Sequence, residues 1–217
     1  MSTGSPAILR IPLILLALAN LAILGMRLRP WPDIFNLPGN GTTGFDPAIS
    51  LVAYVFFFYW IGGNRGEEMR KGLTIGTGFG FLAGLVLVAE VLLSQRPGAH
   101  LGLVAIGMYC FAGILWGVAG MRATGHAGNA TIGLVSGAWS AMVSCIMACT
   151  AVLATLNLDA SVPLSTDPWK QYEGLAVGNP TTQLLVHSLL TATGFLLIGP
   201  LVGGAAGFLF GMLGQAD

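Results

Sequence analysis

Residues 72–93 read GLTIGTGFGFLAGLVLVAEVLL, and Glu90 is the one acidic or basic residue among them. As an α-helix, a stretch of this length extends about 33 Å. The hydrocarbon core of a bilayer is about 30 Å thick, so an apolar helix of about 20 residues crosses it. This stretch is therefore predicted to be a transmembrane helix.

The composition of the whole chain agrees with a membrane location. The 217 residues are 54% hydrophobic and 8% charged, and the mean hydropathy is +0.78. Ordinary soluble domains have about 25% charged residues, so this composition excludes a soluble globular protein. The formal net charge is zero, which leaves no basic surface for a nucleic acid. The expected partner is the lipid bilayer, and no nucleic-acid partner is expected.

Six apolar stretches predict an all-α fold, a polytopic membrane helix bundle with six transmembrane helices. They form a single integral membrane domain over residues 1–217 and lie at 8–28, 45–63, 73–93, 101–121, 131–156 and 184–213. The second has a short apolar core that ends in an aromatic cluster at residues 56–60. The sixth contains Pro200, which predicts one bent helix, with a broken helix pair as the alternative. The first also resembles a secretory signal, but its apolar run continues past the small residues at 17–19, which favours an uncleaved anchor.

Six crossings place both termini on one side of the membrane. With a cytoplasmic N-terminus, five basic residues lie inside and four outside. The inner ones lie in short loops, where the positive-inside rule applies most strongly. We therefore expect both termini in the cytoplasm and the chain in a bacterial inner membrane. The inner set is Arg10, Arg65, Arg70, Lys71 and Arg122, and the outer set is Arg27, Arg29, Arg96 and Lys170.

A shift of 57 positions superposes the second and third stretches on the fourth and fifth. The shift matches Arg65 with Arg122 and the triplet Thr-Ile-Gly at 74–76 with the same triplet at 131–133. A match of this kind predicts a tandem two-helix (hairpin) repeat, with units at about 45–94 and 101–156. Accidental similarity is the alternative.

Glycines recur every four residues in two of the stretches. Because such spacing stays near one face of a helix, it predicts seams where helix backbones approach closely. The seams pack the bundle internally or, alternatively, face another membrane subunit or a second copy of the chain. The helix-packing residues are Gly72, Gly76, Gly80 and Gly84, then Gly199, Gly203, Gly207 and Gly211, with Gly133 and Gly137 in the fifth stretch. Gly113 and Gly117 extend the pattern to the fourth.

Two polar residues inside predicted spans are candidates for a solute or proton site. Glu90 is an acidic residue within the third predicted span, and an ionisable group in a membrane is a functional candidate. It lies four residues before Ser94, so a carboxylate solvated at the interface is the alternative. Asn20 lies in the middle of the first span, where an interhelical hydrogen bond and a polar pocket are both consistent with it.

Motifs for enzyme or cofactor chemistry are weak. The three histidines and three cysteines lack metal, haem or redox-pair spacing, so we expect no cofactor and no metal. The leading hypothesis is a non-enzymatic integral membrane protein, an accessory or assembly subunit built by glycine-mediated helix packing. The alternative is a small-solute transporter or substrate-binding membrane subunit with a site near Glu90.

Overall fold

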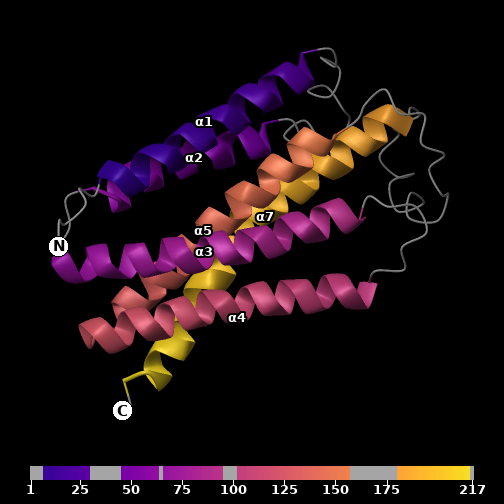
Figure 1. The fold of residues 1–217 in the computed structure, drawn as a ribbon. Helices are drawn as coiled ribbons and strands as arrows, with labels where there is room; N and C mark the ends of the chain where they lie inside the picture. Colours follow the sequence, from indigo (N-terminus) through magenta and orange to yellow (C-terminus); the bar gives the residue numbers. More distant parts are fainter. Residues whose placement is uncertain (1–6, 30–44, 64–65, 95–101, 157–179, 216–217) are drawn as a thin grey trace.

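The computed structural model describes residues 7–29, 45–63, 66–94, 102–156 and 180–215. This part of the chain is all-helical (Figure 1). Its helices are α1 (Ala7–Leu28), α2 (Asp46–Ile61), α3 (Glu67–Ser94), α4 (Gly102–Ala127), α5 (Ala130–Thr155) and α7 (Pro180–Leu213). The prediction of an all-α fold is therefore confirmed.

Five helices of the described part are long and apolar enough to cross a membrane: α1, α3, α4, α5 and α7. The second predicted span is shorter than expected, because α2 has 16 residues. A helix of that length extends about 24 Å, less than the thickness of the hydrocarbon core. The count of six spans is therefore not confirmed.

Local sequence explains where several helices begin and end. Pro47 lies in the first turn of α2, where its missing N–H has no helical partner to lose, and Gly62 follows its last residue. Between α4 and α5, Gly128 has a φ of 65°, a backbone conformation that favours glycine. The side chain of Asn129 then caps α5 by accepting a hydrogen bond of 2.8 Å from the backbone N–H of Thr131.

Helix α7 is one continuous helix with Pro200 inside it, rather than a broken helix pair. Pro200 has no N–H to donate to the carbonyl of Leu196, so the helix lacks one backbone hydrogen bond there. With 34 residues, α7 extends about 51 Å. An apolar helix longer than the hydrocarbon core is accommodated by tilting, by kinking or by local thickening of the bilayer.

Helix α5 lies at the centre of the bundle, in contact with α3, α4, α7 and α1. Of its most apolar window, 78% is buried inside the protein, compared with 33% or less in the other four long helices. α1 begins and α7 ends at the same end of the bundle (Figure 1). α5 is therefore the most enclosed of the five long helices.

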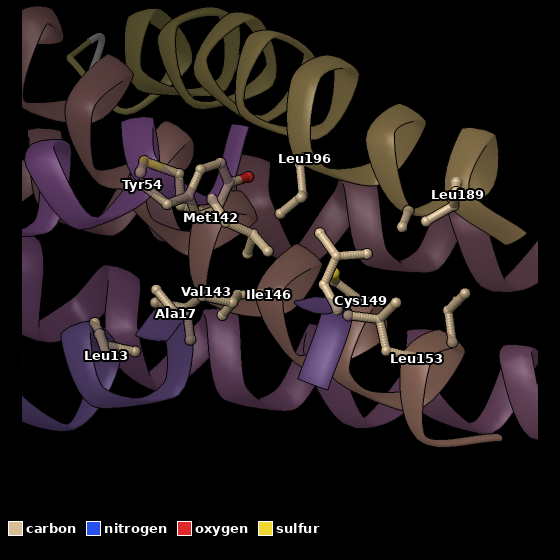
Figure 2. Close-up of a cluster of buried hydrophobic side chains, with 14 of the residues drawn as sticks. Leu13, Ala17, Tyr54, Met142, Val143, Ile146, Cys149, Leu153, Leu189 and Leu196 are labelled. Atoms are coloured by element: carbon tan, nitrogen blue, oxygen red, sulfur yellow. The ribbon is translucent and has the colours of Figure 1, made fainter. Parts of the chain in front are cut away.

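The largest cluster of buried side chains joins α1 and α2 to α5 and α7 (Figure 2). Phe58 of α2 packs edge-on against Trp139 of α5, with ring centroids 5.1 Å apart. Edge-to-face packing is a favourable geometry for aromatic rings. Other members are Leu13, Ala17, Tyr54, Met142, Val143, Ile146, Cys149, Leu153, Leu189 and Leu196.

The predicted hairpin repeat is not confirmed. Helix α4 packs against α5, whereas α2 packs chiefly against α1 and also contacts α7. The two proposed units therefore place their first helices in different surroundings. Arg65, which carries part of the sequence match, lies outside the described residues.

Three further residues considered in the sequence also lie outside the described ranges: the basic residues Arg96 and Lys170, and His100, one of the three histidines.

Candidate functional site

The glycines of α3 lie against α5. A Cβ atom added at Gly76 would lie 2.7 Å from the backbone oxygen of Ser136, and one added at Gly80 would lie 2.6 Å from that of Ser140. Real Cβ atoms essentially never come this close to another atom. The Ser136 hydroxyl also donates a hydrogen bond of 2.9 Å to the carbonyl oxygen of Gly72. Gly72 and Gly84 lie against Ile132 and Met147 of α5.

The glycines of α7 lie against the other side of the same helix and against α4. A Cβ atom added at Gly207 would lie 2.5 Å from the backbone oxygen of Gly133 and 2.8 Å from the Cα atom of Gly137. Gly203 lies against Gly137 and Ala141, Gly199 against Cys145, and Gly211 against Thr124. The glycine faces of both helices are thus occupied by contacts within this chain.

An apolar cavity of about 390 Å³ lies between α3, α4, α5 and α7, a volume within the range of small-molecule sites. Three of its lining residues are exposed at the outer surface: Tyr109 at 43%, Ile198 at 61% and Val202 at 48%. The cavity therefore opens sideways, toward the lipid in a membrane. The rest of its wall consists of Leu87, Gly113, Trp116, Cys145, Thr191, Gly194, Phe195 and Gly199.

The cavity exists because α4 and α7 touch over only part of their length. Gly120 and Gly207 bring the two backbones into direct contact. Toward the other end, Gly113 of α4 and Gly194 of α7 have no atom within 4 Å of an added Cβ. Gly117, which lies between Gly113 and Gly120 in α4, contacts a side chain instead of a backbone: the ring of Phe210. The glycine pattern of α4 therefore serves close packing at one end and leaves open space at the other.

Glu90 lies next to this cavity. The residue is 8% exposed, and its carboxyl group is hydrogen bonded to the hydroxyl of Tyr109, which lines the cavity. The Tyr109 ring lies 6.1 Å from that of Phe195 on α7. This burial does not fit a carboxylate freely solvated at the membrane surface.

The other polar groups of the cavity wall are bonded within the chain. The indole N–H of Trp116 donates a hydrogen bond of 3.0 Å to the hydroxyl of Ser144. The hydroxyl of Thr191 donates to the carbonyl oxygen of His187, also in α7, at 2.9 Å. The hydrogens of Trp116, Thr191 and Tyr109 are therefore already used in hydrogen bonds within the chain. The hydroxyl oxygens of Tyr109 and Thr191 retain lone pairs that can accept a hydrogen bond.

Asn20 lies away from the cavity, between α1 and α5. Its side chain is fully buried. Its amide N–H groups donate hydrogen bonds to the carbonyl oxygen of Leu16 at 2.9 Å and to the hydroxyl of Thr150 at 2.8 Å. Its side-chain oxygen has no partner in the described part of the chain. The structure thus places Asn20 in an interhelical hydrogen bond and not with Glu90.

Within the described ranges, no group of three or more His, Cys, Asp or Glu side chains could hold a metal ion. Cys145 and Cys149 are buried free thiols, and Cys110 is exposed. The arrangement around Glu90 can bind and position an apolar molecule, with two hydroxyl oxygens available to accept a hydrogen bond.

Sequence reasoning missed Tyr109 and Trp116, which supply the polar side of the cavity and its inner wall. Both are single aromatic residues in an apolar stretch, where such side chains are ordinary. A buried glutamate in a span does require a hydrogen-bonding partner, which could have directed attention to the tyrosine of the next helix. Comparison with protein families, curated proteins and solved structures finds no match to this chain.

Proposed function

We propose that this protein is a non-enzymatic integral membrane subunit that holds a lipid-like molecule in the cavity between α4 and α7. The observation that carries the proposal is the sideways opening of an apolar cavity of about 390 Å³ beside the Glu90–Tyr109 pair. A ligand dissolved in the bilayer can enter such a cavity without crossing water. The four helices around the cavity, α3, α4, α5 and α7, are in close contact with one another at glycines.

The walls define the class of ligand. Nearly all of the lining is hydrocarbon or aromatic ring, which suits an alkyl or isoprenoid chain. The accessible polar atoms are hydroxyl oxygens with committed hydrogens, so they favour a ligand that donates a hydrogen bond. We therefore propose a long-chain molecule with a single hydroxyl group, oriented with that group toward Tyr109.

The proposal is tested with a long-chain alcohol that carries a photoreactive group on its chain. The full-length protein is placed in lipid nanodiscs, labelled by illumination and analysed by peptide mass spectrometry. Labelling is expected at the facing walls of α4 and α7. Gly113→Leu fills the cavity and should remove this labelling, whereas Gly107→Leu should not, because Gly107 also faces open space but does not line the cavity. Equal labelling of the two variants would refute the site.

A role as an accessory or assembly subunit without a small ligand is the second candidate. It is favoured over transport of a polar solute. The polar groups of the described cavity wall are hydrogen bonded within the chain, so they offer no hydrated route for such a solute. Its test is the mass of the gently solubilised protein, for which association with other membrane subunits is expected. A small-solute transporter would instead require that Glu90→Gln abolishes uptake.

We further propose a bacterial inner membrane with both termini in the cytoplasm. Four described basic residues support this orientation: Arg10, Arg70, Lys71 and Arg122 all lie toward the ends of helices at the end of the bundle where α1 begins. A green fluorescent protein fused after Asp217 should fluoresce, since this reporter folds in the bacterial cytoplasm. A fusion that accumulates normally but does not fluoresce would contradict this orientation and place the C-terminus on the opposite side of the membrane.

A further inference from the structure

A second hollow, the α3–α4 groove, lies on the surface between these two helices. Its volume is about 760 Å³, and it shares no lining residue with the cavity beside Glu90. One end is basic, with Arg122 and His126, and the remainder is mainly apolar. The apolar walls include Ile75, Phe79 and Leu82 of α3 and Met121 of α4.

The guanidinium group of Arg122 is held over this groove. It lies 5.6 Å from the centroid of the Phe79 ring, a distance at which a cation is attracted to the face of an aromatic ring. Among the described residues, no carboxylate forms an ion pair with it; the ion pair that the structure records joins Lys71 and Glu67 at 2.9 Å. The positive charge of Arg122 is therefore available to an external anion.

The depth of Arg122 matches that of a lipid headgroup. Helix α4 has 26 residues and extends about 39 Å, roughly 9 Å more than the hydrocarbon core. Arg122 lies five residues before Ala127, the last residue of α4, or about 7.5 Å along the axis. This places its charge near the boundary between hydrocarbon and headgroups, with the apolar part of the groove extending into the bilayer.

We propose that the α3–α4 groove binds one anionic phospholipid. Its phosphate lies between Arg122 and His126, and an acyl chain lies along Ile75, Phe79 and Leu82. The ligand is complementary to the groove in two ways: its negative group matches the basic end, and its hydrocarbon chain matches the long apolar wall. Basic pockets between transmembrane helices on the cytoplasmic side recognise anionic headgroups in this way.

Native mass spectrometry of the full-length protein tests the proposal, with phosphatidylglycerol and phosphatidylcholine of identical chains as probes. The wild type should bind the first phosphatidylglycerol about fivefold more tightly than phosphatidylcholine, as expected for one basic contact. Arg122→Gln should lose this preference. Lys71→Gln should keep it, because Lys71 lies near the same end of the bundle but does not line the groove.

Gly78→Leu provides a second variant that retains both basic residues. Gly78 lines the groove and has no atom within 4 Å of an added Cβ, so a leucine should fill the space for the acyl chain and weaken binding of the lipid. Equal affinities for the two lipids in the wild type would overturn the proposal. So would a preference that survives both Arg122→Gln and Gly78→Leu, or displacement of the lipid by millimolar inorganic phosphate.

Discussion

Gly80→Ala should destabilise the protein, although alanine forms helices better than glycine. The added Cβ atom would lie 2.6 Å from the backbone oxygen of Ser140 and 2.8 Å from the Cβ atom of Val143. Neither atom belongs to the flexible end of a side chain, so α3 and α5 must move apart. Overpacking of this kind costs about 1–3 kcal/mol of unfolding free energy.

The matched control is Gly78→Ala in the same helix. Gly78 has open space around an added Cβ, so this variant should gain up to about 1 kcal/mol from helix propensity. Thermal unfolding of the detergent-solubilised full chain measures both. A loss of about 2 kcal/mol corresponds to a melting temperature lower by about 4–8 °C for a chain of this size. Equal melting temperatures of the two variants would refute the reasoning that α3 packs against α5 through Gly80.

Three further predictions concern α7, α1 and the cavity. Gly207→Ala should lower the melting temperature, because its Cβ atom would lie 2.5 Å from the backbone oxygen of Gly133; Gly204→Ala should not, because its nearest contact, with Ala138, is an ordinary 3.5 Å. In a double-mutant cycle, Asn20→Ala and Thr150→Ala should show a coupling of about 0.6 kcal/mol in unfolding free energy, and strict additivity would contradict their hydrogen bond. Tyr109→Phe should weaken binding of a long-chain alcohol by up to about tenfold but leave binding of the matching alkane unchanged, as measured by competition with the photoreactive probe.

The long helices could be predicted from sequence because their signal is local. An apolar run such as 131–156 is sufficient to define α5, which begins at Ala130 and ends at Thr155. Several boundaries were less accurate: α3 begins six residues before the predicted start at 73, α4 continues six residues beyond the predicted end at 121, and α7 begins four residues before the predicted start at 184. The last part of α4 contains Arg122, Thr124 and His126, polar residues that lie outside the predicted apolar stretch but continue the helix.

The site could not be predicted from local pattern, because it depends on which helices meet. The spacing of Gly113 and Gly117 is the same as that of the packed glycines, yet Gly117 contacts Phe210 and Gly113 faces open space. Only the crossing of α4 and α7 distinguishes them. In the same way, the sequence identified Glu90 as unusual, but its partner Tyr109 lies on the next helix. Long-range geometry therefore determines the cavity.

The most direct test of the bundle is a disulfide between α5 and α7. A Cβ atom added at Gly199 would lie 3.5 Å from the Cβ atom of Cys145, within the range that a disulfide requires. Gly199→Cys should therefore form an intramolecular disulfide with Cys145 on mild oxidation, identified by peptide mass spectrometry. Leu197→Cys should not, because Leu197 is 54% exposed on the outer face of α7. Absence of the Cys145 cross-link in Gly199→Cys, or its equal formation in Leu197→Cys, would contradict the packing of α7 on α5.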